Sequence, residues 1–515
     1  MLTFTFQNLT KAKIIFDERA RRDFDFLREQ FKTENAATKF MKSYRFSVNP
    51  YTYVITPLGT YNIGMTEELC NKCEELNIEY EIEDELLKLI KPSLNIDKIL
   101  DVPNKKYQYR WYQKQLLEAL LDNGRGVIIS PTRSGKSLIL AGLCHNIFQS
   151  YIQNKKQNIL LLVPNINLVF QMAEDLEEYG LGEFYNIQMF TAKTMNKKGA
   201  KVKVDKFNIY IANSQYLLLH GDELPFIDVI ICDEVHQQTK GSEISKIIKS
   251  VKISNKFGCT GTLPKSLVDK WNISGTFGPV LDEVEIQALQ EEGILADVKV
   301  YPIRFNHKKK ENFKKIDPEE LEGLSKDEAD SKKLEIYQKA YQKESIYLSI
   351  YEEANLKALN LCKKIIEEHP SWNALILFDF TEQGQQLFKL LDFKNKHYVD
   401  GSVDVLDRKE IIKQMNAIEG GHITIAQSKT FSTGLTIKNI EVVCIMTNQS
   451  SPTKIIQSIG RGLRRVEKNT LIVLDFFHNY QYSEKHFFER AELYKQFYGL
   501  EFGKNYKIKE VFLNN

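Results

Sequence analysis

The sequence predicts an α/β fold in which two consecutive parallel-sheet domains follow a small α+β domain. Apolar runs of strand length alternate with helical patterns from about residue 106 to 302, and the alternation returns after a polar segment, from about 346 to 515. Strands that alternate with helices are joined by crossover connections, which produce a parallel sheet covered by helices. A chain of 515 residues also exceeds what one hydrophobic core can hold.

Residues 1–82 are predicted to form the small N-terminal domain. Apolar residues alternate along residues 2–6 as in a strand, and residues 18–31 follow a helical spacing. Aromatic and basic side chains are interleaved further along, at Lys42, Tyr44, Arg45, Tyr51 and Tyr53. They indicate either a nucleic-acid surface or the packing of a sheet. Residues 83–105, charged and then interrupted by prolines, are expected to be a linker.

The two parallel-sheet domains are expected at residues 106–302 and 346–515, the second ending in terminal helices. Between them, a basic run and a long polar, helix-prone span predict a connector at residues 303–345. The break is placed after Pro302 because the apolar strand pattern of the first domain stops there.

A phosphate-binding loop is predicted at residues 130–137, which read Ser-Pro-Thr-Arg-Ser-Gly-Lys-Ser. The loop follows the apolar run 126–129 and precedes a helical pattern, which is the order of strand, turn and helix that such a loop requires. The first N–H groups of that helix have no partner and the helix dipole adds positive charge, so a triphosphate can supply the missing acceptors. Ser130 stands where the usual pattern has its first glycine.

Within this loop the residue types suit the triphosphate of ATP. Gly135 lets the backbone come close, Lys136 can reach the β- and γ-phosphates, and the Ser137 hydroxyl can hold Mg²⁺. Thr132 and Ser134 complete the expected nucleotide-binding residues of the loop.

A second candidate site follows about a hundred residues later, where Asp233-Glu234-Val235-His236 closes an apolar run. Its carboxylates are expected at the carboxyl end of a parallel strand, the edge at which ligands bind in such sheets. Asp233 is placed to hold Mg²⁺, commonly through water, and Glu234 to orient the attacking water and accept its proton.

Near the C-terminus, Arg461 and Arg464 are spaced so that both guanidinium groups lie on one face of a helix. They indicate either an ordinary basic helix or arginines that neutralise the γ-phosphate in the transition state.

Together these motifs resemble a superfamily 2 helicase of the DExH type, which implies two tandem RecA-like domains with ATP between them. The matching segments occur in the family's order over residues 109–465. In the first domain the resemblance implies adenine recognition by Arg110 and Gln113. It implies nucleic-acid contacts at Pro164, Asn165, Gln171, Ser214 and Gln215. It implies coupling of ATP hydrolysis to strand movement by His236, Thr260 and Thr262.

In the second domain the resemblance implies nucleic-acid contacts at Phe378, Gly401 and Ser428. It implies nucleotide contacts at Gly434 and Gln457, and it makes Arg461 and Arg464 catalytic. Thr436 stands where many relatives carry an Asp, which puts a contact to the nucleotide ribose in doubt.

The layout also resembles the UvsW-type phage DNA helicases, in the small N-terminal domain and in Phe-Ser-Thr-Gly at residues 431–434. That resemblance implies ATP-driven work on single-stranded and branched DNA, with forks, junctions and RNA–DNA hybrids as substrates, in replication, recombination or repair and with proteins of those processes as partners. The protein is expected to act as a monomer.

Three other functions stay open at this point. An ATP-dependent RNA helicase uses the same motor, and no residue reads the 2′-hydroxyl unambiguously. A non-unwinding annealing clamp would not need the intact Lys136, Glu234 and Arg464. The motor subunit of a restriction system would need a nuclease from a partner.

Composition bounds the environment of the protein. With 43% hydrophobic and 27% charged residues and a net charge of +2, the chain has the composition of a globular protein and does not exclude a nucleic-acid partner. No apolar run reaches the ~20 residues of a membrane span, and no signal peptide precedes the first strand, so the cytoplasm, or a host cytoplasm, is expected. The seven scattered cysteines suit a reducing compartment, and Cys70 and Cys73 are expected to be ordinary core residues.

Overall fold

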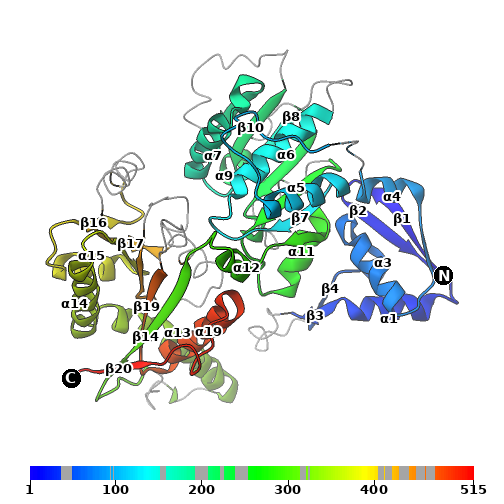
Figure 1. Cartoon of the computed structure of the whole chain (residues 1–515). Coiled ribbons are helices and arrows are strands. Elements are labelled where there is room, and N and C mark those ends of the chain that lie inside the picture. The colour runs from blue at the N-terminus through cyan, green and yellow to red at the C-terminus, as the bar shows by residue number, and fades with distance from the viewer. Residues whose placement is uncertain are drawn as a thin grey trace. The chain divides into compact units, whose positions relative to one another are not determined.

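The computed structural model describes residues 1–35, 49–92, 94, 96, 98–150, 158–191, 207–220, 226–237, 247, 253–313, 321–322, 325–403, 411, 420–428, 440–447, 459 and 470–514. These residues form two compact units. The first contains Met1–Pro131 and Gly135–Val284, and the second contains Thr132–Ser134 and Glu285–Asn515. Figure 1 labels the elements of both units.

The N-terminal part of the first unit is a four-stranded sheet in the order β5-β2-β1-β6. The strands are β1 (Leu2–Asn8), β2 (Lys11–Ile15), β5 (Thr60–Asn62) and β6 (Tyr80–Ile82). Its helices are α1 (Arg21–Gln30), the 3-10 turn η1 (Ile63–Met65), α3 (Thr66–Glu75) and α4 (Asp84–Ile90). A separate pair of antiparallel strands joins β3 (Lys32–Glu34) to β4 (Tyr51–Tyr53). The prediction of a small α+β fold is confirmed in kind, whereas Lys42, Tyr44 and Arg45 lie outside the described residues.

The predicted linker at 83–105 begins with structure of its own. Helix α4 buries Leu86 and Ile90 in the hydrophobic core of the N-terminal sheet. Two buried residues four positions apart make one apolar stripe, enough to bind a two-turn helix to a sheet in spite of its charged residues. The N-terminal domain therefore extends through α4.

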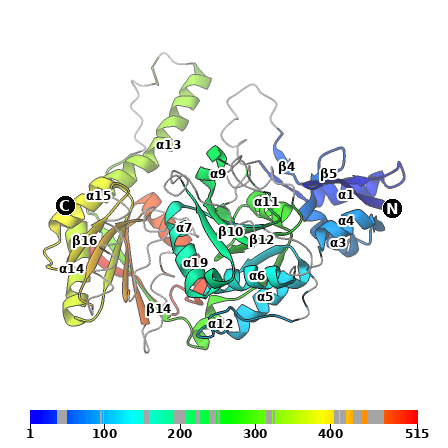
Figure 2. The same cartoon turned by 90° about the horizontal axis from the view of Figure 1, so that it is seen from above.

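The rest of the first unit is a seven-stranded parallel sheet in the order β13-β7-β12-β11-β8-β10-β9. Its strands are β7 (Gly126–Ile129), β8 (Asn158–Val163), β9 (Asn186–Phe190), β10 (Asn208–Asn213), β11 (Val229–Asp233), β12 (Lys256–Thr260) and β13 (Val280–Glu283). The helices and turns are α5 (Trp111–Asn123), α6 (Lys136–Ser150), α7 (Ile166–Glu178), η2 (Leu181–Glu183), α9 (Ser214–His220), η4 (Val235–Gln237) and α11 (Leu267–Phe277). Figure 2 shows α5, α6 and α7 on one face of this sheet and α9 and α11 on the other.

The second unit is also built on a seven-stranded parallel sheet, in the order β16-β17-β15-β18-β19-β14-β20. Its strands are β14 (Asp297–Asn306), β15 (Ala374–Phe378), β16 (Lys396–Val399), β17 (Ile423–Gln427), β18 (Val442–Ile445), β19 (Thr470–His478) and β20 (Lys509–Phe512). Its helices are α12 (Ile286–Glu291), α13 (Lys326–Ser349), α14 (Glu352–Glu368), α15 (Thr381–Leu390) and α19 (Gln481–Tyr498). In Figures 1 and 2, α14 and α15 lie on one side of this sheet and α19 on the other. Two parallel-sheet domains in tandem confirm the predicted α/β class.

The division between the two units differs from the predicted boundary at 302/303. The first unit ends at Val284, and β14, which contains Pro302, belongs to the second sheet. Strand β20 pairs only the last four residues of β14, Ile303–Asn306, so Pro302 has a neighbouring strand on one side alone. A proline without an N–H to donate is tolerated at such a position. The expected connector at 303–345 likewise contains the end of β14 and most of α13.

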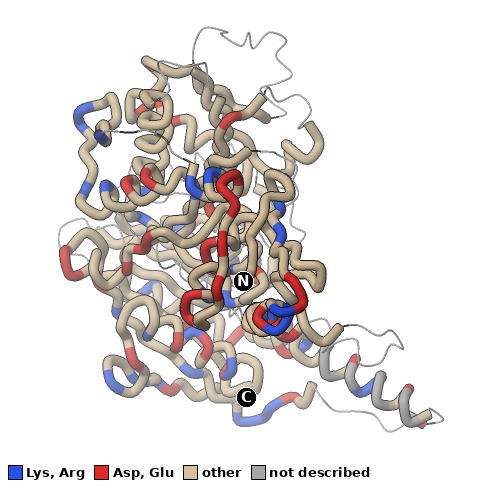
Figure 3. The backbone as a smooth tube through the Cα atoms, turned by 90° about the vertical axis from the view of Figure 1, so that its right-hand side faces the viewer, with Lys and Arg blue, Asp and Glu red and all other residues tan. Residues whose placement is uncertain are grey.

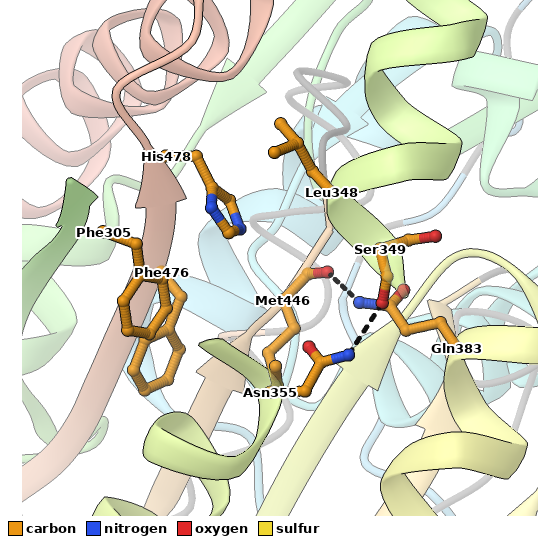
Figure 4. A pocket seen from close by; sticks show the side chains of 8 residues that line it. All are labelled: Phe305, Leu348, Ser349, Asn355, Gln383, Met446, Phe476 and His478. Carbon is orange, nitrogen blue, oxygen red and sulfur yellow. Dashed lines mark hydrogen bonds between the residues drawn. The ribbon is translucent and has the colours of Figure 1, made fainter. Parts of the chain in front are cut away.

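The second unit encloses a small pocket lined by side chains from its sheet and its helices (Figure 4). Phe305 and Phe476 stack in parallel on one side, with ring centroids 5.8 Å apart. On the other side Asn355 donates to the Ser349 carbonyl and Gln383 donates to the Met446 carbonyl, at 2.8 and 3.0 Å. The volume of about 20 Å³ suffices for about one water, so this pocket is a packing feature.

The surface and the cysteines agree with the composition. Figure 3 shows basic and acidic residues interspersed along the described chain. All seven cysteines are buried and reduced, including Cys70 and Cys73 in the N-terminal core. Among the described helices, none combines the length and the apolar character needed to cross a bilayer.

Candidate active site

The parallel arrangement of the first sheet brings the predicted catalytic residues to one edge. The phosphate loop follows β7, Asp233 ends β11, and Thr260 ends β12, which lies between them. All three strands run in the same direction, so their carboxyl ends meet at one edge of the sheet. The central position of β12 explains how Thr260 can contact both of its neighbours.

The loop backbone is shaped for close approach by a ligand. Arg133 and Gly135 both have positive φ, at 71° and 82°, and helix α6 begins at the next residue, Lys136. The Ser130 N–H donates to the Thr260 carbonyl at 2.9 Å, which fixes the start of the loop to β12. The first turn of α6 thus opens on the loop, as an anion site at a helix N-terminus requires.

Gln113 lies directly beside this loop. Its Oε1 accepts from the Arg110 N–H at 2.9 Å, and its side chain is 4% exposed. A Cβ on Gly135 would lie 2.4 Å from Nε2 of Gln113, so the glycine is needed for this packing. The structure therefore brings together the predicted adenine-recognition residue and the predicted phosphate loop.

Lys136 faces the Asp-Glu pair from across the edge of the sheet. Its Nζ lies 3.7 Å from Oε1 of Glu234 and 3.4 Å from the Ser130 carbonyl. Burial disfavours the charge of Lys136, but the carboxylates of Glu234 and Asp233 outweigh this effect and raise the pKa of Lys136. Lys136 is therefore held as a cation in a largely buried position.

The two carboxylates have different environments. Burial and the neighbouring charge of Glu234 raise the pKa of Asp233 above its usual range. Burial also acts to raise the pKa of Glu234, but Lys136 and His236 outweigh it and hold that pKa below its usual range. Two adjacent carboxyl groups whose pKa values are driven apart are a mark of a functional site.

Backbone strain accompanies this pair. Glu234 has a φ of 52°, which is uncommon outside glycine, and its N–H donates to Oδ1 of Asp233 at 2.9 Å. A left-handed residue just after a strand turns the chain into η4 and keeps both carboxylates at the edge of the sheet.

The predicted coupling residues form one connected group. His236 Nδ1 lies 3.1 Å from Oε2 of Glu234 and 2.8 Å from Oγ1 of Thr260. The Thr260 hydroxyl donates to the Thr262 carbonyl at 2.9 Å. These contacts join the carboxylate to the segment that leads from β12 to α11.

Two residues that the sequence analysis missed contact Ser137. Tyr179, just after α7, places its hydroxyl 3.0 Å from the Ser137 hydroxyl. Burial raises the pKa of Asp175 to about 6, and the nearby Ser137 hydroxyl acts to lower it. The two positions are four residues apart and so lie on one face of the helix end, but no local pattern in the sequence points from them to Ser137.

The residues present fit ATP with Mg²⁺. A glycine-containing loop with N–H groups, a largely buried lysine and an adjacent glutamine suit a nucleoside triphosphate. The Ser137 hydroxyl and the Asp233 carboxylate are oxygen ligands of the kind that Mg²⁺ prefers. When bound, the ion would neutralise charge on the phosphates.

Three of the predicted nucleic-acid residues of the first domain, Pro164, Asn165 and Ser214, lie at the same sheet edge. Val163 and Asn213 are partners in the pairing of β8 with β10, and Pro164 and Ser214 follow them directly. Asn165 caps α7 by accepting from the N–H groups of Asn167 and Leu168. Gln171 lies within α7 and the exposed Gln215 within α9.

In the second domain, Gly401 and Ser428 follow strand ends, whereas the side chain of Phe378 is buried. Gly401 follows β16 and Ser428 follows its partner β17, and the Ser428 hydroxyl donates to the Phe378 carbonyl at 2.9 Å. Phe378 itself has no exposed surface. Its ring is stacked on Tyr398, and a Cβ on Gly384 would lie 2.3 Å from it. A base cannot stack on this ring, so the prediction of a nucleic-acid contact is corrected for the Phe378 side chain.

Four predicted residues lie outside the described part of the chain. They are Gly434, Gln457, Arg461 and Arg464. Their roles stay predictions.

Tandem parallel-sheet domains with a phosphate loop and an Asp-Glu pair at one sheet edge are typical of motor proteins that a nucleotide drives. Residues 106–265 match the family described as type III restriction enzyme, res subunit, and residues 357–466 match the helicase conserved C-terminal domain. These matches support a superfamily 2 helicase that resembles UvsW.

Two relatives and one solved structure illustrate this similarity. The ATP-dependent DNA helicase uvsW of Enterobacteria phage T4 is 28% identical over 72% of this chain and 68% of the relative. The general transcription and DNA repair factor IIH helicase/translocase subunit XPB of Enterocytozoon bieneusi is 25% identical over 79% of this chain and 64% of the relative. The DNA-bound type ISP restriction-modification enzyme LlaBIII shares the fold, with a TM-score of 0.56 and 13% identity over 79% of this chain and 31% of that chain.

Proposed function

We propose that this protein is an ATP-dependent DNA helicase or translocase that unwinds or remodels branched DNA. The observation that carries the proposal is the pairing of Lys136 with Glu234 at the sheet edge, beside Ser137 and Asp233. The names of both relatives, a DNA helicase and a helicase/translocase subunit, support DNA as the substrate.

Glu234 acts as the base that takes a proton from the attacking water. In the described structure Lys136 lies against Glu234 and lowers its pKa, which makes the carboxylate a weak base. A γ-phosphate draws Lys136 to itself, so binding of ATP raises the pKa of Glu234 toward the range in which it accepts a proton. Substrate binding thereby activates the base.

His236 orients the Glu234 carboxylate and transmits a change in its position to Thr260. It lies against both Glu234 and Thr260, so a shift of the carboxylate during hydrolysis changes the contact with the segment before α11. This route couples the chemistry to the parts of the first domain that hold the nucleic acid.

The strand is held mainly by its phosphates. Pro164 and Ser214 follow paired strands, and the N–H groups at the start of α7 and α9 lie there as well. Backbone N–H groups and small hydroxyls contact phosphates without reading bases, so we expect little sequence preference and strong sensitivity to salt.

The use of Mg²⁺ is part of the same proposal. So is the preference for branched DNA, which the N-terminal domain supports. The N-terminal domain has its own core and packs on α11, so it supplies a second surface rigidly placed beside the first motor domain. A branched substrate offers a duplex arm for such a surface while a single strand occupies the motor.

The decisive experiment measures ATP hydrolysis in the presence of Mg²⁺ with different nucleic acids. The reactions contain no nucleic acid, single-stranded DNA, a DNA fork, an RNA–DNA hybrid or an RNA fork of matched sequence. Lys136→Ala removes the phosphate contact, and Lys114→Ala, in the exposed pair with Glu118 on α5, is the matched control.

We expect the DNA fork to give the strongest stimulation. Lys136→Ala should lose turnover, and Lys114→Ala should keep it. Stimulation by the RNA fork alone would assign the protein to the RNA helicases instead. Hydrolysis that no nucleic acid changes would contradict a motor and leave the annealing clamp.

A further inference from the structure

The N-terminal domain and the first motor domain share an interface that includes helix α11. Gly64 in η1 approaches this helix so closely that a Cβ on it would lie 2.2 Å from the carbonyl oxygen of Ser274. A Cβ on Gly275 would come within 2.8 Å of the Cβ of Asn62, the residue before η1. Contact this close leaves the two surfaces little freedom to slide past one another.

An aromatic contact extends the interface along the same helix. The side chain of Trp271 packs against the hydrophobic core of the N-terminal domain. Its ring centroid lies 6.3 Å from that of Phe31, with the two planes tilted by 50°. Trp271 and Gly275 are four residues apart in α11, so both contacts use one face of this helix.

The second part of the interface is a buried arginine, Arg125, which directly precedes β7. Its guanidinium group donates to the carbonyls of Thr276 and Phe277, the last two residues of α11, at 3.0 and 3.1 Å. It also donates to the carbonyl of Leu89 in α4, at 3.2 Å. One side chain therefore joins the end of α11 and the start of β7 to a helix of the N-terminal domain.

The charge of Arg125 suits this position. The last carbonyls of a helix lack partners within the helix and carry partial negative charge, so they attract a cation. Arg125 is 3% exposed, and burial lowers its pKa to about 10, which still leaves the side chain protonated at neutral pH. Because burying a charge is costly unless it is hydrogen-bonded, the three carbonyls hold the guanidinium group in one place.

The residue before Arg125 brings the same two domains together. Gly124 follows α5 with a φ of 66°, and a Cβ there would lie 1.7 Å from the carbonyl oxygen of Pro92, two residues after α4 ends. The turn from α5 to β7 is therefore shaped to accept the end of α4. This turn precedes β7 and the phosphate loop follows it, so the interface and the nucleotide site lie at opposite ends of one strand.

We propose that Arg125 is a positioning residue for branched DNA, because it holds the N-terminal domain in the placement that lets one molecule bind a duplex arm and a single strand together. The inference rests on the proposed function, in which the N-terminal domain offers a surface to the duplex arm. Arg125 contacts neither the nucleotide nor the DNA. It acts by making the N-terminal domain and the first motor domain one body, so that a bound arm moves with the motor.

The test measures ATP hydrolysis over a range of concentrations of single-stranded DNA and, separately, of a DNA fork. Arg125→Met keeps a long side chain and removes the three hydrogen bonds to carbonyls. Gly64→Ala, on the other side of the interface, places a methyl group against the Ser274 carbonyl and leaves Arg125 unchanged. Lys88→Met, which removes an exposed cation next to Leu89 on α4, is the matched control.

We expect the fork concentration that gives half-maximal stimulation to rise roughly fivefold or more in Arg125→Met and in Gly64→Ala. The corresponding concentration of single-stranded DNA should match the wild type, because the sheet edge with the predicted nucleic-acid contacts is unchanged. Lys88→Met should match the wild type on both DNAs. Equal losses on both DNAs would mean that Arg125 only supports the fold, and would overturn the proposal. If Arg125→Met does not fold, Gly64→Ala decides in the same way.

The result for the wild type separates this proposal from the proposed function. A wild type that no DNA stimulates would refute the proposed function and, with it, this role of Arg125. A fork preference that persists unchanged in both variants would overturn the role of Arg125 alone. Hydrogen exchange of the backbone amides in η1 and α11 reports the docking without any nucleic acid. Faster exchange in Arg125→Met supports the proposal, and unchanged exchange contradicts it.

Discussion

The hydroxyl of Ser137 lies 3.0 Å from the hydroxyl of Tyr179, so a residue placed to hold Mg²⁺ is tied to the end of α7. The start of the same helix carries Asn165, one of the predicted nucleic-acid residues. Helix α7 thus joins the candidate nucleotide site to the sheet edge at which nucleic-acid contacts are predicted. The hydrogen bond competes with the use of the Ser137 oxygen as a metal ligand.

Tyr179→Phe removes this competition and keeps the ring, which packs edge-on against Tyr107 with centroids 4.9 Å apart. A neutral hydrogen bond contributes about 1 kcal/mol, so we expect the KM for ATP with Mg²⁺ to fall by roughly fivefold. Steady-state hydrolysis measures it. Tyr107→Phe, whose hydroxyl donates to Glu178 instead, is the control. A higher KM in Tyr179→Phe would mean that Tyr179 supports the metal ligand.

Glu234→Gln tests the base directly. The amide keeps the size of the side chain but cannot accept the proton, so we expect kcat to fall by about 10²- to 10⁴-fold. Nucleotide binding should persist, because Lys136 loses its carboxylate partner and is free for the phosphate. Single-turnover hydrolysis and an equilibrium nucleotide titration separate the two effects. Glu283→Gln, at the end of β13 in the same sheet, should turn over normally, and a normal rate in Glu234→Gln would exclude it as the base.

Gly135→Ala tests the shape of the loop. The residue has a φ of 82°, which costs a side-chain residue about 1–2 kcal/mol, and the new Cβ would lie 2.4 Å from Nε2 of Gln113. We expect the KM for ATP to rise by roughly 5- to 30-fold. Gly503 has the same φ of 82° with nothing within 4 Å, so Gly503→Ala carries the strain without the clash and should leave this KM unchanged. An unchanged KM in Gly135→Ala would refute the role of this packing.

The sequence was sufficient where a short motif and its neighbouring strand carry the chemistry. The loop before Lys136 and the pair Asp233-Glu234 each follow an apolar run, and parallel strands must bring their carboxyl ends to one edge. The motif order then indicated Gln113 and Thr260 as partners of the site, and the structure places both there.

The features that the sequence did not predict depend on contacts between residues far apart in the chain. Nothing local connects Ser137 to Tyr179, which lies 42 residues further on. Phe378 is aromatic in the position of a strand-binding motif, but it also ends a fully apolar strand, and burial decided its role. The boundary was predicted after Pro302 because the apolar pattern stops there, whereas pairing with β19 and β20, both far along the chain, makes residues 297–306 one strand of the second sheet.

Arg490→Met tests how the second domain is held together. The guanidinium of Arg490 forms two hydrogen bonds with Asp475, at 2.7 and 3.0 Å, and both side chains are almost fully buried. Removing the cation leaves the Asp475 carboxylate buried beside Tyr494 alone, which costs about 3–5 kcal/mol of unfolding free energy. Calorimetry should show a lower transition temperature. Lys485→Met breaks an exposed pair on the same helix and should change stability by less than about 0.5 kcal/mol, and equal effects would contradict this account.

Lys256→Met tests the cost of the buried lysine through its pH dependence. Burial, followed by the charge of Arg125, lowers the pKa of Lys256 from 10.5 to about 7. Between about pH 7 and 10.5 the unfolded chain therefore holds a proton that the folded chain has released, so the stability of the wild type rises with pH across this window. The methionine variant lacks this contribution. We expect Lys256→Met to be more stable than the wild type below pH 7, by a few kcal/mol at most, and the difference to vanish toward pH 10. Thermal unfolding at several pH values, with the exposed Lys13→Met as the control, measures it, and a difference independent of pH would mean that Lys256 is not buried as a strained cation.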